Sequence, residues 1–391
     1  MKKVFLGFLI ILLLGVIGIW CYFKFRFVLE ITLEEKRNIE FGQEYNVKDF
    51  ILETNGIFED KIVEFYELGE KEVTLTYLDK YNKKKEYSFT VNIVDEQVPM
   101  IYAGNTVTIY KGDTNPNLFS NVICVDYVSK VKCEVEGEYN SNVIGSYPLK
   151  YVATDESGNS ISKDFTLKVI NRPTSTGSST SSKVTYTPFK TIYDKYKTDK
   201  TLVGIDVSAW QNPIDFKKVK EAGADFVIMR IALFYKGNIE LDMRYKENIK
   251  NAHDAGLKVG LYLYSEAKTQ EEVLKAVDLI LDNLDYDIDL PIAYDWEDFR
   301  NYNSYNLSLY EFNKLAYTFM DKLKEKGHDV MLYGSTNYLE KMWIPKDYDV
   351  WVAQYYKEVT YNGKYKMWQL TSSGSIPGIG GAVDVDILYL D

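Results

Sequence analysis

The stretch Leu290-Pro-Ile-Ala-Tyr-Asp-Trp-Glu297 is an apolar run that ends in two carboxylates, Asp295 and Glu297. In a β-strand, residues i and i+2 lie on the same face, so both acids would point the same way. An apolar strand with paired acids at its carboxyl end is typical of the catalytic mouth of an α/β barrel. Two nearby carboxylates are also what cleavage of a glycosidic bond requires. On this stretch alone, the acids could equally cap the next helix or bind a basic neighbour.

The residues around this stretch predict a barrel with an irregular end. From residue 201 onward, apolar strand patterns alternate with helical patterns, which favours parallel β/α units. The last two gaps between strands, 356–366 and 371–382, are too short for a crossover helix. We therefore expect early helices and late bare strands in a domain spanning 201–391. The predicted strands are 203–207, 226–231, 258–264, 290–297, 330–334, 350–355, 367–370 and 383–388, and the predicted helices are 216–223, 242–255, 268–284, 308–326 and about 337–342.

Four acids occupy strand ends in this domain, namely Asp206, Asp295, Glu297 and Asp384. The carboxyl ends of parallel strands meet at one mouth, so the first three should converge there. An antiparallel last strand would bring Asp384 to the same place. Aromatic and amide side chains occur at matching positions; each alone is more simply explained by packing, but their shared location favours substrate binding. These predicted substrate-binding residues are Tyr262, Tyr264, Tyr333, Gln354, Trp368 and Gln369.

Several motifs of residues 203–391 resemble the family 25 glycoside hydrolases, the lysozymes first known from fungi and phages. The motifs occur in the family's order and without large gaps. They are Gly204-Ile-Asp-Val-Ser-Ala-Trp-Gln211, Phe226-Val-Ile-Met-Arg230, Ala255-Gly-Leu-Lys-Val-Gly-Leu-Tyr262, Leu290 to Glu297, Trp351-Val-Ala-Gln-Tyr355, Trp368-Gln-Leu-Thr-Ser372 and Gly381-Ala-Val-Asp384. The resemblance implies a (β/α)5(β)3 barrel without metal or cofactor.

The resemblance also implies an activity, hydrolysis of the β-1,4 bond between N-acetylmuramic acid and N-acetylglucosamine in peptidoglycan. Glu297 would be the general acid, with a pKa raised by burial and by the charge of Asp295. Asp295 would stabilise the positive charge at the anomeric carbon or orient the substrate's N-acetyl group. Asp206 and Asp384 would hold the charge and hydrogen bonds of the site in place.

Two positions depart from the family pattern. The family often has a His-Phe pair where this chain has Leu263-Tyr264, and usually has Asn where this chain has Asp386. The first difference would alter substrate contacts, and the second adds a negative charge near the mouth. Neither removes the acid pair, so we expect activity.

The amino terminus predicts a membrane anchor over residues 1–26. Residues 4–23 are twenty residues without a charge, and a helix of that length spans the roughly 30 Å hydrocarbon layer of a bilayer. The run is long and ends in Trp-Cys-Tyr-Phe, which favours an uncleaved single-pass helix over a signal peptide. Flanking charges do not set the orientation. From the position of the run and the nature of the domains after it, we expect a cell-membrane protein with an extracellular catalytic domain.

Two tandem β modules are expected at 27–96 and 97–171, since short strands alternate in period two and the pattern recurs 76 residues later. The second contains Ala153-Thr-Asp-Glu-Ser-Gly-Asn159 and resembles bacterial immunoglobulin-like modules, which implies all-β sandwiches. We interpret 27–171 as a spacer; binding of a cell-envelope protein is the alternative. A flexible linker is predicted at 172–200, of which 172–185 is rich in Ser and Thr.

Composition excludes other classes. The net charge of −11 disfavours nucleic acid as a partner. His253 and His328 are the two histidines, and neither lies near a ligand cluster or a nucleophile motif. Cys124 and Cys133, nine residues apart, form either a disulfide or two buried thiols. The 33 tyrosines suit carbohydrate binding as well as packing.

The leading hypothesis is therefore a membrane-anchored muramidase whose β modules carry the enzyme into the wall. The alternative is a catalytically weak or inactive barrel that binds glycan as a cell-wall scaffold.

Overall fold

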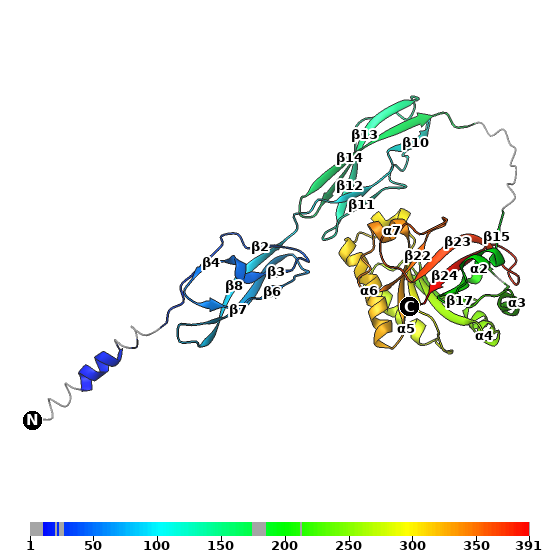
Figure 1. Cartoon of the computed structure of the whole chain (residues 1–391). Coiled ribbons are helices and arrows are strands. Elements are labelled where there is room, and N and C mark those ends of the chain that lie inside the picture. Colours follow the sequence, from blue (N-terminus) through cyan, green and yellow to red (C-terminus); the bar gives the residue numbers. More distant parts are fainter. Residues whose placement is uncertain (1–10, 20–21, 23–26, 174–184, 212, 391) are drawn as a thin grey trace, which may run out of the picture. The chain divides into compact units, whose positions relative to one another are not determined.

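The computed structural model describes residues 11–19, 22, 27–173, 185–211 and 213–390 (Figure 1). The chain divides into two compact units, Met1–Gln97 and Val98–Asp391. Of the predicted anchor over residues 1–26, residues 1–10, 20–21 and 23–26 lie outside the described residues, and 11–19 are helical. Across the described ranges, no helix combines the length and the apolar character needed to cross a membrane.

A barrel-like sheet occupies the carboxyl-terminal part of the second unit, from Thr201 to Tyr389. Eight strands follow one another around it in the order β23-β22-β21-β20-β19-β17-β16-β24, and β24 pairs again with β23 to complete the ring. These strands are β16 (Thr201–Val207), β17 (Phe226–Tyr235), β19 (Lys258–Ser265), β20 (Ile292–Asp295), β21 (Val330–Ser335), β22 (Asp349–Ala353), β23 (Met367–Ser375) and β24 (Val383–Tyr389). Two short strands, β15 (Thr187–Pro188) and β18 (Asn238–Leu241), pair with β23 and β17.

Helices follow the first five barrel strands, as the sequence predicts. They are α3 (Phe216–Glu221), α4 (Tyr245–Asp254), α5 (Gln270–Leu281), α6 (Leu309–Glu325) and α7 (Thr336–Lys341), with 3-10 turns η2 (Ala209–Gln211) and η3 (Phe299–Ser304). Capping boxes begin α5 at Thr269 and α6 at Ser308, each with a glutamate three residues later. No helix lies in the described stretches between β22, β23 and β24. The expected change from early helices to bare closing strands is confirmed.

The last strand closes the barrel in the opposite direction to its neighbours. β24 is antiparallel to β16, with Asp206 opposite Asp384 and Gly204 opposite Asp386. β16, β17 and β19 to β23 are parallel. The amino end of β24 therefore lies beside the carboxyl end of β16, and Asp384 reaches the mouth with the other strand-end acids.

Alternation along β20 separates two apolar layers. Inside the barrel, Ala293 belongs to a buried cluster with Met331 and Trp351. Outside, Trp296 is fully buried among the aromatic side chains of the helical layer, including Phe312 at 4.7 Å between ring centroids. Because Trp296 is held in the outer layer, its neighbours Asp295 and Glu297 are directed to the interior.

The barrel begins earlier than the sequence predicts. Within the expected linker 172–200, residues 174–184 lie outside the described residues, but α2 (Phe189–Tyr196) is a formed helix. Its side chains Phe189 and Ile192 are 1% and 4% exposed and belong to the barrel's main core. The boundary at 200 is therefore corrected to about 187, since the Tyr- and Lys-rich composition concealed an apolar helix face.

Both β modules repeat one strand arrangement. In the first, β8 pairs with β7 and with the parallel strand β2; in the second, β14 pairs with β13 and with the parallel strand β10. The hairpins keep one register, since Val73 faces Phe89 and Leu149 faces Phe165. The first unit contains β1 (Ile31–Leu33), β2 (Asn38–Glu40), β3 (Tyr45–Asn46), η1 (Val47–Phe50), β4 (Ile51–Thr54), β5 (Ile57–Phe58), β6 (Ile62–Val63), β7 (Gly69–Leu78) and β8 (Lys84–Val94). The second module contains β9 (Met100–Tyr102), β10 (Thr106–Tyr110), β11 (Ile123–Val125), β12 (Val131–Glu136), β13 (Gly145–Asp155) and β14 (Ser160–Ile170).

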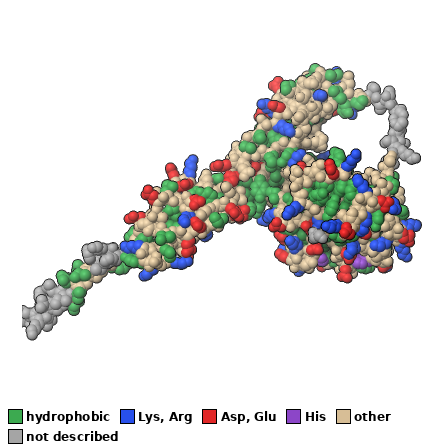
Figure 2. Space-filling view, in the orientation of Figure 1, with side chains coloured by type: hydrophobic (Ala, Val, Ile, Leu, Met, Phe, Trp, Pro, Cys, Tyr) green, Lys and Arg blue, Asp and Glu red, His purple; other side chains and the backbone are tan. Residues whose placement is uncertain are grey.

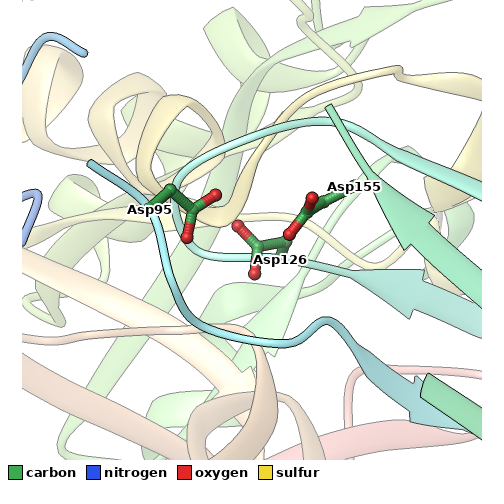
Figure 3. Close-up of side chains that lie close together, drawn as sticks. All are labelled: Asp95, Asp126 and Asp155. Atoms are coloured by element: carbon green, nitrogen blue, oxygen red, sulfur yellow. The ribbon is translucent and has the colours of Figure 1, made fainter. Parts of the chain in front are cut away.

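The second module is tied together by a disulfide and by two acidic turns. Cys124 of β11 and Cys133 of β12 are bonded, which resolves the alternative left open by the sequence. Asp126 accepts hydrogen bonds from the backbone N–H groups of Val128 and Ser129, and Asp155 accepts from the backbone N–H of Asn159. Figure 3 shows these two carboxylates close together; their oxygens lie within 4.8 Å.

The same module contacts the barrel next to the segment after Glu297. The amide side chain of Asn303, in η3, accepts from the Cys124 N–H at 3.2 Å and donates to the Val122 carbonyl at 2.9 Å. The Leu309 N–H, at the start of α6, donates to the Asp126 carbonyl at 2.8 Å. Ile123 and Val125 join the barrel's main core. The module thus holds the segment that leads from the acid pair into α6.

Gly204 allows β16 and β17 to lie close enough to place Asp206. A Cβ atom at 204 would come within 2.5 Å of the Phe226 carbonyl oxygen and 2.6 Å of its ring. We expect Gly204→Ala to lower the free energy of unfolding of the barrel by about 1–3 kcal/mol, because the strand would have to move. Gly380→Ala, where nothing lies within 4 Å, is the matched control. Equal urea midpoints for the two variants would contradict this.

Candidate active site

A cleft of about 740 Å³ opens at the carboxyl ends of the parallel strands. All four predicted acids line it, together with four of the six predicted substrate-binding residues. The lining residues predicted from sequence are Asp206, Asp295, Glu297, Asp384, Tyr262, Tyr264, Tyr333 and Gln369. The positions of these residues come from six different strands, so the barrel's closure is what assembles them.

Asp295 and Glu297 occupy different environments although they are two residues apart. Asp295 is 6% exposed, and its Oδ1 has no hydrogen-bond partner among the described residues. Glu297 faces the open cleft and keeps contact with solvent. Burial, then repulsion from Glu297, raises the pKa of Asp295, while Arg230 opposes the rise. Enclosure by the cleft walls raises the pKa of Glu297, and a hydrogen bond with Tyr333 opposes it. Since repulsion acts on both members, the pair retains one proton more readily than either acid alone.

Asp206 and Asp384 face each other across the β16–β24 pair. Asp206 is 7% exposed, and burial raises its pKa, with further contributions from the charges of Asp384 and Asp386. Asp384 is half-buried, and desolvation followed by the charge of Glu297 raises its pKa to about 6. Negative charge is therefore costly throughout the cleft, where Arg230 is the one cation among the described lining residues.

Gln369 links the acids to the tyrosines. Its Nε2 donates to Asp206 Oδ2 at 2.8 Å, and its Oε1 accepts from the hydroxyls of Tyr333 at 3.0 Å and Tyr355 at 2.8 Å. The Tyr333 hydroxyl also contacts Glu297. Because a hydroxyl has one proton, Tyr333 donates either to Gln369 or to Glu297, which connects the two acidic pairs.

Tyr262 and Tyr264 line the wall formed by β19. Burial and the charge of Asp206 raise the pKa of Tyr262, so it is a neutral hydroxyl at physiological pH. The Tyr264 hydroxyl donates to Glu266 Oε1 at 3.1 Å. Both rings present an apolar face with a polar tip, as sugar binding requires.

Gln354 and Trp368 are not brought into the cleft lining. Strand alternation turns Trp368 outward from its neighbour Gln369, so its ring is 3% exposed in the outer core and its Nε1 donates to the Gln354 carbonyl at 2.8 Å. The Gln354 amide accepts a hydrogen bond from the Thr336 hydroxyl and donates one to the Thr360 hydroxyl, which fixes the loop after β22. These two residues support the site without lining it, contrary to the sequence expectation.

The structure adds lining residues outside the predicted substrate-binding set. Trp210, Tyr235 and Tyr355 are 85%, 44% and 53% exposed at the cleft. Arg230 is fixed by Asp242, at 2.8 Å, and Asp242 also accepts from the Ala209 N–H of the turn that carries Trp210. The position of Trp210 four residues after Asp206, at a strand end, was the available signal. Nothing local indicated that Tyr235 would turn toward the same cleft.

The cleft offers acids and hydroxyls rather than a metal cage. Among the described residues, no three of its carboxylates gather within 4.8 Å of one another. Proton transfer and charge stabilisation are the chemistry that this arrangement can perform.

Removing one cleft charge should stabilise the fold at neutral pH. When the pKa of an acid is higher in the folded chain than in the unfolded chain, the fold loses stability as the pH rises from the unfolded pKa of about 4 through the folded pKa. The folded pKa of Asp384 is about 6. We expect Asp384→Asn to raise the free energy of unfolding by about 1–3 kcal/mol at pH 7 and by little at pH 4. Asp347→Asn, an exposed site outside the cleft, is the control. An equal rise in the free energy of unfolding at pH 7 and pH 4 would contradict a raised pKa of Asp384.

Comparison with known proteins shows which family the domain that carries this cleft resembles. Residues 205–379 match the model of the glycosyl hydrolases family 25. An autolytic lysozyme of Clostridium acetobutylicum is 30% identical over 186 residues, which cover 47% of this chain and 54% of that protein. The uncharacterized protein YegX of Escherichia coli is 25% identical over 210 residues, covering 52% of this chain and 75% of YegX. The chain thus spans about half the length of the clostridial relative.

The solved structure of a family 25 glycosyl hydrolase from Bacillus anthracis is similar over 51% of this chain and 91% of that chain, with 20% identity and a TM-score of 0.43. The carboxyl-terminal domain, matched over residues 205–379, carries the acids of the cleft and is a glycoside hydrolase domain of family 25.

Proposed function

We propose that this chain is a membrane-anchored peptidoglycan hydrolase that cleaves the β-1,4 bond between N-acetylmuramic acid and N-acetylglucosamine. The observation that carries the proposal is the pair Asp295 and Glu297, one buried and one open to the cleft, both with raised pKa values. Retention of a proton at neutral pH is what a general acid needs to protonate a leaving oxygen. The 30% identity to a clostridial autolytic lysozyme supports peptidoglycan as the substrate.

Glu297 is the general acid in this proposal, and Asp295 is the ionised partner. Arg230 favours the carboxylate form of Asp295 against the larger effect of burial, and we place the shared proton on Glu297. Glu297 also has the open face that a leaving group must approach. While Glu297 is protonated, the Tyr333 hydroxyl donates to Gln369 instead. When Glu297 gives up its proton, Tyr333 can turn to the new carboxylate and stabilise it.

In this proposal Asp295 stabilises the positive charge at the anomeric carbon or orients the substrate's N-acetyl group. The exposed rings of Trp210, Tyr235 and Tyr355 would stack against sugars on either side of the scissile bond. On the face seen in Figure 2, basic and acidic side chains are interspersed over the barrel, without a continuous basic patch. That surface suits a glycan better than a polyanion.

An extracellular location with a membrane anchor fits the amino-terminal half. The helical residues 11–19 expose apolar side chains, such as Ile11 at 71% and Leu14 at 62%. The Cys124–Cys133 disulfide favours an oxidising compartment. The two β modules, which we take to be immunoglobulin-like, would act as a spacer between the bilayer and the wall.

Replacement of the acid tests the reaction. We expect Glu297→Gln to reduce release of reducing ends from purified peptidoglycan by roughly 10²–10⁴-fold, because the amide cannot protonate the leaving oxygen. The full chain, purified in detergent, is assayed, and mass spectrometry locates the new reducing end, which should be on muramic acid.

Glu340→Gln, at an exposed position on α7, is the matched control and should retain full activity. Binding of peptidoglycan without product by the unmodified chain would instead indicate a glycan-binding scaffold. A new reducing end on glucosamine would overturn the bond assignment.

Charges in the apolar run test the anchor. Leu12→Arg combined with Leu13→Arg should raise the ratio of soluble to membrane-bound chain at least tenfold. Each arginine at the centre of a membrane helix costs about 2.5–3.5 kcal/mol. The matched control exchanges the same leucines for isoleucine. Unchanged partitioning of the arginine variant would argue against insertion of residues 4–23.

A further inference from the structure

Asp386 is a buried acid that the proposed reaction does not use. It lies two residues after Asp384 on β24, opposite Gly204, and therefore on the same face one layer deeper in the barrel. It is 0% exposed. Its Oδ1 accepts from the indole Nε1 of Trp351 at 2.9 Å. This single N–H donor is too little to stabilise a full charge in the interior.

Asp386 also lies diagonally across the β16–β24 pair from Asp206. Oδ2 of Asp386 receives no hydrogen bond from an N–H or hydroxyl group of the described residues. The side chains of Asp206 and Asp386 are nonetheless in hydrogen-bonding contact. Two carboxylates have no donor between them, so a hydrogen bond between these groups requires a proton on one of them.

The described residues around Asp206 and Asp386 could not compensate two negative charges on this pair. Asp384 faces it from β24, Asp295 and Glu297 from the end of β20, and Tyr262, Tyr333 and Tyr355 from β19, β21 and the loop after β22. Gln369 on β23 gives Asp206 one N–H, at 2.8 Å. Arg230 of β17 is the one cation among the described lining residues, and it is already paired with Asp242.

We propose that Asp206 and Asp386 share one proton, with Asp206 as the donor, so that the single charge of the pair resides on the deeper carboxylate. Asp386 is then a positioning residue that holds the Asp206 side chain neutral beneath the cleft. Each carboxyl group accepts one N–H, from Gln369 at Asp206 and from Trp351 at Asp386. Asp206, however, lies directly opposite a further acid, Asp384, so a charge on Asp206 meets more repulsion than a charge on Asp386. Burial and the charge of Asp384 raise the pKa values of both acids; the contact between them adds to the rise at Asp206 and opposes it at Asp386.

The consequence concerns where negative charge sits in the cleft. With Asp at 386, the charge lies in the barrel interior and Asp206 meets the cleft as a neutral group. With Asn at 386, the amide could accept from Trp351 and donate to Asp206, and Asp206 would then carry the charge itself. The total charge of the pair is unchanged, but it moves one layer toward Glu297.

The experiment is a carboxyl-carbon NMR titration of the full chain labelled with ¹³C at aspartate Cγ, with Asp206→Asn used to assign the signal. In the unmodified chain, we expect Asp206 to remain protonated above pH 7. In Asp386→Asn, the Asp206 midpoint should fall by at least one pH unit, a tenfold loss of proton affinity. Asp347→Asn, exposed and outside the cleft, should leave it unchanged.

A second measurement rests on the proposed hydrolase activity. Asp386→Asn should move the alkaline limb of kcat/KM to higher pH, since the charge on Asp206 would help Glu297 retain its proton. An Asp206 midpoint below pH 5 in the unmodified chain would overturn the proposal even if the variant failed to fold. An unchanged midpoint in folded Asp386→Asn would do the same. Because the titration needs no turnover, an inactive chain would count against the hydrolase alone.

Discussion

The antiparallel pairing of β24 with β16 is the constraint on which the site depends. It closes the sheet, places Asp384 directly opposite Asp206, and places Asp386 opposite Gly204 in the layer below. The remaining barrel strands are parallel and bring their carboxyl ends to one mouth without help. A parallel final strand would put the amino end of β24, and Asp384 with it, at the far end of the barrel. The direction of one strand therefore decides whether the acids form one cleft.

The cleft gathers four acids, with a fifth, Asp386, buried beneath them, and the one cation among its described lining residues, Arg230, is already paired. Burial and mutual repulsion raise the pKa values of these acids, so each prefers its protonated form more than it would in water. Such a site weakens the fold at neutral pH, and the surrounding apolar layers must offset that cost. The fully buried Trp296 and Trp351 belong to those layers on either side of the acid-bearing strands.

Hydrogen bonds make this collection of acids into two connected pairs. Gln369 reaches Asp206 with its amide nitrogen and accepts from Tyr333 and Tyr355 with its oxygen. Tyr333 in turn contacts Glu297. A change of protonation at one pair can thus be felt at the other through one shared hydroxyl proton. The second β module adds support from outside, since it bonds to Asn303 and to the start of α6.

Sequence patterns alone determined the parts of this protein that depend on neighbouring residues. The i, i+2 spacing placed Asp295 and Glu297 on one face, gap lengths predicted the bare closing strands, and the 76-residue recurrence predicted two tandem β modules. These features follow from local geometry and chain length.

Only the tertiary structure decided which side chains meet. Gln369 and Asp206 are 163 residues apart in the chain. Whether Gln369 or its neighbour Trp368 faces the cleft depends on the register of a strand against its partners, and a one-residue change exchanges the two. For the same reason, the contact between Asp206 and Asp386, the exposure of Tyr235 at the cleft, and the early start of the barrel at α2 could not be read from spacing. Local periodicity fixes a face, whereas burial and pairing arise only when distant strands come together.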